Sequence, residues 1–301
     1  MDTRHLVIYR NLEYQQLFED MAKLLKEPAL GEDHAHKAAG LAGQLIELAV
    51  KYGFEGNLWH CFLAFCLANN ENAYSTSCEI RGAAGGSLDL LAAADFSIFK
   101  ELFDLDIRVL NGPVWEMLAE YRPAQADSKV FNRRIRDRIV NLAVQLEQAE
   151  NVEAFQRLVV DFYREFGVGK FGLNKAFRIV EHDEGQKVVI DPIINVEHVY
   201  LNDIVGYELQ KKKLVENTEA FVNGKEANNV LLFGDAGTGK SSSVKAILNE
   251  YYSRGLRIIE VYKHQFKALS DVLEQIKDRN YKFIIYMDDL SFEDYELEYK
   301  Y

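Results

Sequence analysis

Three things are scarce in this sequence of 301 residues: cysteine, basic charge and long apolar runs. The three cysteines, Cys61, Cys66 and Cys78, are odd in number and lack paired spacing, which argues against a disulfide framework and favours buried, reduced thiols. The strongly apolar run at residues 58–68 is too short to cross a bilayer core of about 30 Å, so it predicts a buried helix. Because the N-terminus also lacks an apolar signal segment, we expect a cytoplasmic protein without a membrane span.

Basic residues number 35 against 47 acidic ones, which gives a formal net charge of −12, and acids outnumber bases on both sides of residue 200. Neither half is suited to neutralise a phosphate backbone, so constitutive binding of nucleic acid is not expected. No second Cys/His pair with zinc spacing follows Cys61 and Cys66, and His34 and His36 alone do not make a metal site.

Residues 1–176 carry the pattern of amphipathic helices. Apolar side chains recur at helical spacing, for example Leu17, Met21 and Leu24, and the pattern returns over residues 135–146. No repeat of fixed period is present, which argues against a solenoid. The sequence therefore predicts an irregular α-helical N-terminal domain.

The pattern changes at residue 177. Two short β-rich runs around a polar turn predict a hairpin-like linker at residues 177–199. Residues 200–301 then alternate between predicted strands (228–233, 257–262 and 282–287) and predicted helices (239–254 and 265–277). Such alternation favours a parallel sheet with crossover helices, so we expect a three-layer α/β/α domain after the helical one.

The segment GDAGTGKS matches the Walker A pattern G-x-x-x-x-G-K-[ST] between a predicted strand and a predicted helix. A loop that wraps phosphate with its backbone N–H groups needs glycines, and the helix that follows directs its positive end at the anion. Lys240 can reach the β- and γ-phosphates, and the Ser241 hydroxyl can bind Mg²⁺. The predicted nucleotide-binding residues of this loop are Gly234, Asp235, Ala236, Gly237, Thr238, Gly239, Lys240, Ser241 and Ser242.

The last predicted strand runs into two acids in FIIYMDDL, a Walker B pattern. Asp288 is the predicted Mg²⁺ ligand, and Asp289 is the candidate to orient the attacking water, so that Lys240 and Asp289 are the predicted catalytic residues. The alternative is that one or both acids only end the strand in solvent.

These motifs resemble those of AAA+ ATPases, within the P-loop NTPase superfamily. The segment Ile204, Val205, Gly206 and Tyr207 resembles the element of that class that lies against adenine. The block 203–293 is also similar to an uncharacterised bacterial family of predicted AAA+ ATPases. The resemblance covers about the last third of the chain; the N-terminal region shares only its helical character. It implies binding of ATP and Mg²⁺ and a homo-oligomer in the full-length protein.

Two departures from this class matter. A typical module has Glu where this chain has Asp289, and the shorter side chain is expected to slow hydrolysis. Only residues 290–301 follow Asp289, whereas the class continues with further strands, a sensor residue, an arginine finger and a helical lid. We therefore predict that this chain is a C-terminally truncated version of a longer protein, in which strands 228–233 and 282–287 lie apart. The alternative is a GTPase-like fold, in which these two strands are neighbours. No sequence motif that recognises guanine follows the second acid here, which argues against that alternative.

Three functions are compatible with these features. The first is Mg²⁺-dependent ATP hydrolysis by an AAA+ module that does conformational work on an unknown protein target, which the N-terminal domain recruits. The second is a nucleotide-dependent binding module or switch with little hydrolysis. The third, a nucleic-acid remodeller or loader, is disfavoured by the acidic composition.

Overall fold

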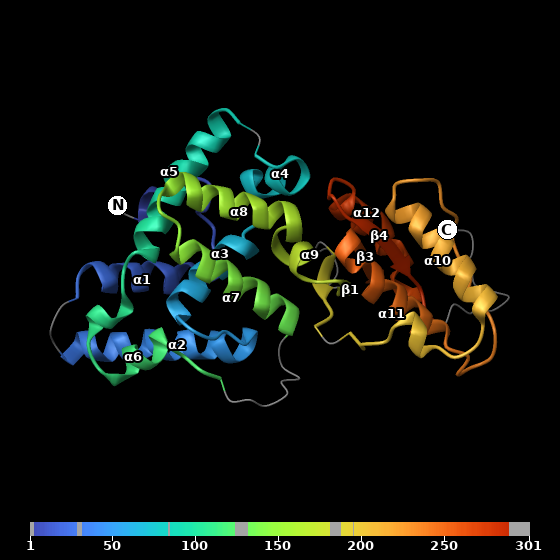
Figure 1. Cartoon of the computed structure of the whole chain (residues 1–301), viewed down its shortest axis with the longest axis horizontal. Helices are drawn as coiled ribbons and strands as arrows, with labels where there is room; N and C mark the ends of the chain where they lie inside the picture. Colours follow the sequence, from blue (N-terminus) through green and yellow to red (C-terminus); the bar gives the residue numbers. More distant parts are fainter. Residues whose placement is uncertain are drawn as a thin grey trace. The chain divides into compact units, whose positions relative to one another are not determined.

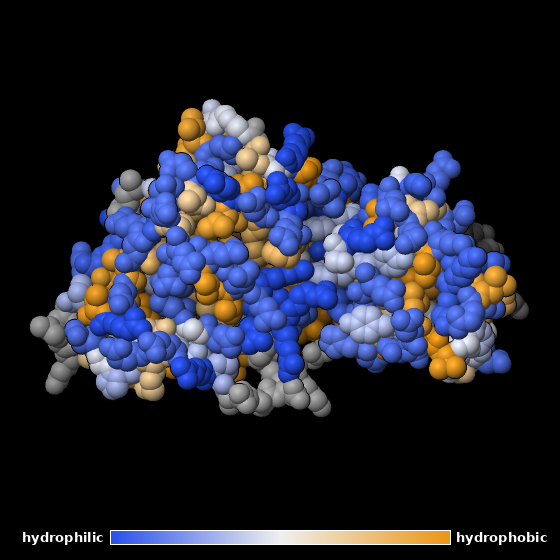
Figure 2. All heavy atoms as spheres, in the orientation of Figure 1, coloured by the Kyte–Doolittle hydropathy of each residue, from blue (hydrophilic) through white to orange (hydrophobic). Residues whose placement is uncertain are grey.

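The computed structural model describes residues 3–28, 32–83, 85–123, 132–180, 188–194 and 196–288. It divides into two compact units, Met1–Leu173 and Asn174–Tyr301 (Figure 1). On the face drawn in Figure 2, hydrophilic residues predominate, and apolar ones are scattered over both units. No helix in the described part of the chain combines the length and the apolar character that a membrane span requires.

The first unit is helical, as its periodicity predicts. Its helices are α1 (Gln15–Lys26), α2 (Glu32–Tyr52), α3 (Leu58–Asn69), α4 (Ala73–Arg81), α5 (Ser87–Phe103), α6 (Pro113–Ala119), α7 (Arg133–Glu147), α8 (Val152–Phe166) and α9 (Gly169–Leu173), with short 3₁₀ turns at Thr3–His5 and Ile107–Leu110. One large apolar core joins them. All of these helices contribute residues to it, so the unit can bury a core without the second unit.

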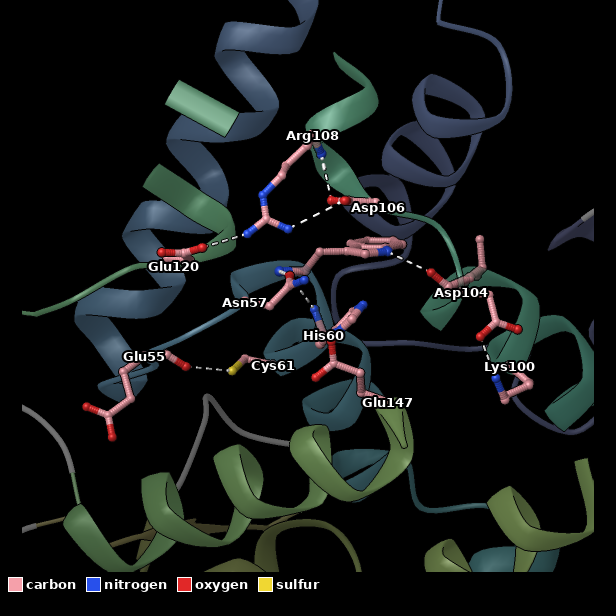
Figure 3. Close-up of polar contacts among 12 residues, drawn as sticks. Glu55, Asn57, His60, Cys61, Lys100, Asp104, Asp106, Arg108, Glu120 and Glu147 are labelled. Carbon is pink, nitrogen blue, oxygen red and sulfur yellow. Dashed lines mark hydrogen bonds and ion pairs between the residues drawn. The ribbon is translucent and has the colours of Figure 1, made fainter. Parts of the chain in front are cut away.

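Helix α3 lies at the centre of this unit. Every residue from Leu58 to Ala68 is buried, which confirms the predicted buried helix. Its first turn is capped by the side chain of Asn57, which accepts hydrogen bonds from the backbone N–H groups of Trp59 and His60 (Figure 3). All three cysteines are buried and free, as their spacing predicts.

The second unit is an α/β unit with a mixed, mostly parallel sheet. Its elements are β1 (Ala176–Val180), β2 (Val189–Pro192), α10 (Glu208–Val222), α11 (Lys240–Tyr251), β3 (Leu256–Glu260), α12 (Leu269–Ile276) and β4 (Lys282–Tyr286), with 3₁₀ turns at Leu201–Asp203, Tyr252–Arg254 and Lys263–Ala268. The strand order is β2-β1-β3-β4. Strands β1 and β2 are antiparallel, whereas β3 is parallel to both β1 and β4.

Two expectations about this unit need correction. The segment 177–199, expected to act as a linker, supplies two strands of the sheet: the predicted hairpin forms, and β1 then pairs with β3. Two of its apolar side chains, Phe177 and Ile190, are fully buried, which explains why the strands of this segment belong to the sheet.

The segment 228–233 is not a strand in the structure. Three of its apolar side chains are exposed, Val230 by 50%, Leu231 by 75% and Phe233 by 87%. An apolar, β-prone segment becomes a strand only when a neighbour satisfies its backbone groups, and the described strands do not pair with it.

The register of the sheet determines which side chains share a face with α11. Ala176 pairs with Ile258, and Ile258 pairs with Ile284. Ala176 and Ile258 form one apolar cluster with Leu248 of α11, against which Ile284 also packs. Because side chains alternate along a strand, every second residue onward from these positions also lies on the α11 face.

Candidate functional site

The glycine-rich loop Gly234–Ser241 connects segment 228–233 to α11, the helix predicted to follow it. Three glycines in it have positive φ: Gly234 at 139°, Gly237 at 77° and Gly239 at 81°. An L-residue adopts these conformations only with strain, so the loop depends on glycine at these positions. Gly239 immediately precedes α11, and the free N–H groups of the first helical turn therefore belong to the loop.

Lys240 folds back over this loop. Its Nζ donates hydrogen bonds to the carbonyl oxygens of Gly234 and Asp235, each at 2.8 Å. The hydroxyl of Thr238 donates to the same Asp235 oxygen at 2.8 Å. The ammonium group thus lies inside the turn of the loop, where an anionic ligand would form a stronger, charge-assisted contact with it.

Ser241 and Asp288 are brought together although 47 positions separate them in the sequence. The Ser241 Oγ donates to both carboxylate oxygens of Asp288, at 3.3 Å each. Asp288 lies just beyond the carboxyl end of β4, and Ser241 is in the first turn of α11. A hydroxyl and a carboxylate are hard oxygen ligands, the type that Mg²⁺ prefers.

The segment 204–207 lies beside this loop. A methyl group of Ile204, Cγ2, is 3.6 Å from the position that a Cβ on Gly239 would occupy, and the carbonyl oxygen of Ile204 accepts a hydrogen bond from Lys211 at 2.8 Å. Val205 is 91% exposed and Tyr207 is 52% exposed. The segment therefore presents apolar surface next to the loop.

Two polar side chains that the sequence did not single out border the Ser241–Asp288 pair. Tyr286 interacts electrostatically with both Ser241 and Asp288, and burial raises its pKa to about 12. Glu260, the last residue of β3, is half-buried; burial and, more weakly, the charge of Asp288 raise the pKa of its carboxyl group. An acid among the apolar residues of the predicted strand RIIEVY was the signal that could have drawn attention to Glu260.

The predicted catalytic residue Asp289 lies outside the described residues. All other predicted site residues belong to the loop Gly234–Ser241, the first turn of α11, the segment 204–207 or the end of β4. In the described part of the chain, no cluster of three or more His, Cys, Asp or Glu side chains has the arrangement of a metal site.

Residues 174–301 match the model of a family described as a protein of unknown function, DUF815. This match begins at the first residue of the second structural unit.

Shorter similarities connect the chain with replication factor C large subunits. That of Staphylothermus marinus is 35% identical over 81 residues, or 27% of this chain and 18% of the relative. That of Methanococcus maripaludis is 34% identical over 76 residues, and that of Methanococcus vannielii 36% over 76 residues; each alignment covers 25% of this chain and 15% of the relative. The chain thus matches less than a fifth of the length of these relatives, and no solved structure matches it significantly.

Proposed function

We propose that the second unit binds ATP with Mg²⁺ at the loop Gly234–Ser241 and hydrolyses it as an AAA+ module. The pairing of Ser241 with Asp288, between the start of α11 and the end of β4, is the observation that carries this proposal. It brings together the Walker A and Walker B motifs, which are far apart in the sequence. The partial similarity to replication factor C large subunits supports the AAA+ relationship.

In this proposal the loop backbone and the first turn of α11 bind the phosphates, with Lys240 as the mobile positive charge. Ser241 and Asp288 fit a magnesium ion by their chemistry, the serine as a direct ligand and the aspartate directly or through water. When bound, the metal would neutralise charge on the phosphate oxygens. Asp289 is proposed to orient the attacking water.

The exposed side chains of Val205 and Tyr207 are proposed to lie against the adenine ring. Burial of such apolar surface by a base would contribute to affinity, at roughly 25 cal/mol per Å² of surface removed from water. The preference for adenine over guanine rests on the resemblance to AAA+ ATPases and on this apolar segment.

A titration of the full chain with a fluorescent ATP analogue in the presence of Mg²⁺ tests the assignment. Lys240→Ala should weaken binding by about 10- to 100-fold, because a charge-assisted contact with the phosphates contributes roughly 1.5–3 kcal/mol. Lys212→Ala is the matched control, since Lys212 is an exposed lysine of α10 in the same unit. Equal affinity in the parent and in Lys240→Ala would refute the proposed site.

A second candidate function is a nucleotide-dependent switch with little hydrolysis. It is favoured by the segment 228–233, which leads into the loop without pairing with any described strand. A segment held so weakly could change its arrangement when the loop binds phosphate. A turnover assay separates the two functions: Asp289→Asn should abolish phosphate release by an ATPase, whereas a switch would show the same low turnover in both proteins.

We also propose that the helical first unit recruits a protein target and that the protein forms a homo-oligomer. Both proposals rest on the resemblance to AAA+ ATPases. Light scattering of the purified protein with and without ATP tests the second one, and a mass that stays monomeric in both conditions contradicts it for this chain.

A further inference from the structure

A row of polar side chains crosses the sheet next to the proposed site. Arg178 of β1 pairs in register with Glu260 of β3, and Glu260 pairs in register with Tyr286 of β4. Paired residues on parallel strands face the same side of a sheet. Each residue of this row lies two positions after a residue that faces α11, namely Ala176, Ile258 or Ile284. The row therefore lies on the α11 face of the sheet, and Glu260 and Tyr286 lie at the carboxyl ends of β3 and β4.

Asp288 lies beyond the end of β4 and is on the same side of the sheet, because its carboxylate accepts hydrogen bonds from Ser241 of α11. Tyr286 lies near enough to the Ser241–Asp288 pair to interact electrostatically with both residues. The side chain of Glu260 therefore lies on the same side of the sheet as Ser241 and Asp288, on the strand next to the one that leads to Asp288.

The charges around Glu260 come from three elements. It interacts electrostatically with Lys245 of α11, with Arg178 of β1 and with Asp288, and only Asp288 repels it. Lys245 also forms an exposed ion pair with Glu197 at 3.1 Å. A second, half-buried carboxylate therefore lies within electrostatic range of Lys245, Arg178 and Asp288, the proposed metal ligand.

We propose that Glu260 is a second carboxylate of the Mg²⁺ site, which holds a metal-bound water on the α11 face beside Asp288. This inference rests on the function proposed above. Mg²⁺ gives up its waters reluctantly and is commonly bound through one or two carboxylates plus the phosphates of the nucleotide. Its waters need acceptors, and carboxylates that orient such outer ligands typically change metal affinity by 10- to 100-fold when mutated.

The competing explanation is that Glu260 only pairs with Arg178 and Lys245 and stabilises the sheet. Two variants of the full chain distinguish the roles. Glu260→Gln removes the carboxylate charge and keeps the size of the side chain. Glu197→Gln is the matched control, because it removes the other acidic partner of Lys245 on the exposed surface.

The measurement is the affinity of the ATP complex for Mn²⁺, used as a paramagnetic probe of the Mg²⁺ site, together with ATP affinity in EDTA. We expect Glu260→Gln to weaken Mn²⁺ binding on the order of 10-fold and to leave metal-free ATP affinity unchanged or stronger. Glu197→Gln should stay within about twofold of the parent. A purely structural role would instead lower the melting temperature and leave Mn²⁺ affinity as in the parent.

Glu260→Asp keeps the charge on a side chain shorter by one methylene and should show intermediate Mn²⁺ affinity; it decides the question if the glutamine variant does not fold. Parent-like Mn²⁺ affinity in every folded variant of Glu260 overturns the inference. If the parent and Lys240→Ala bind ATP equally, the proposed function itself has failed. If ATP binding depends on Lys240 and metal affinity does not depend on Glu260, only the inference about Glu260 has failed.

Discussion

Asp95 provides the sharpest test of how the first unit is held together. Its carboxylate is completely buried on α5 and accepts hydrogen bonds from three consecutive backbone N–H groups of the N-terminal segment. The Oδ2 atom accepts from Ile8 at 2.7 Å and from Tyr9 at 2.9 Å, and Val7 donates to Oδ1 at 2.9 Å. This one side chain therefore fixes the segment that precedes α1 against the core.

The change Asp95→Asn keeps the size of the side chain but replaces one acceptor oxygen with an N–H₂ group. Hydrogen bonds to a charged group contribute about 1.5–3 kcal/mol each, and a buried donor left without an acceptor costs about 1–3 kcal/mol. With at least one of the three donors left unsatisfied and the others weakened, we expect a loss of roughly 3–5 kcal/mol in the free energy of unfolding of the first unit.

Urea unfolding followed by tryptophan fluorescence measures this loss directly. The two tryptophans of the chain, Trp59 and Trp115, are both buried in the first unit, so the signal reports on that unit. Asp161→Asn is the control, since Asp161 forms an exposed ion pair with Arg164 on α8 and should change stability by less than about 1 kcal/mol. A loss below about 1 kcal/mol for Asp95→Asn would mean that the segment is not held by this carboxylate.

Two further predictions concern the same unit and use the same fluorescence signal. His60 is buried against Phe103, with Glu147 3.6 Å away (Figure 3), and burial lowers the pKa of His60. Because the unfolded chain then binds the proton more readily than the folded one, the stability of the unit should fall as the pH drops below about 6.5. The variant His60→Gln should reduce that fall. An equal pH dependence in both proteins would assign it to other groups. Gly169→Ala should destabilise the first unit by about 1–3 kcal/mol, because φ at Gly169 is +64° and a Cβ there would overlap the Glu71 side chain. The control is Gly56→Ala, since Gly56 has a φ of +80° but open space around the position of its Cβ. If Gly56→Ala lost as much stability as Gly169→Ala, the overlap with Glu71 would not be the cause.

The features that the sequence by itself determined are local ones. Helical periodicity predicted the first unit, and the apolar run at residues 58–68 predicted its buried central helix, because a helix satisfies its own backbone and needs only a pattern of side chains. The same holds for the helix that begins at Lys240 and for the strands β3 and β4, which form where apolar runs predict them. Strand β3 is largely buried, whereas every residue of β4 is only half-buried.

Pairing between distant segments was decided only by the tertiary structure. The hairpin expected to be a linker joins the sheet through the pairing of β1 with β3, and segment 228–233 stays outside the sheet despite its β-prone composition. Both outcomes depend on hydrogen bonds to a neighbouring strand, which the residues of the segment itself do not encode. For the same reason Glu260 was overlooked: the strand register, and not the spacing along the chain, places it beside Tyr286 and on the same face as Asp288.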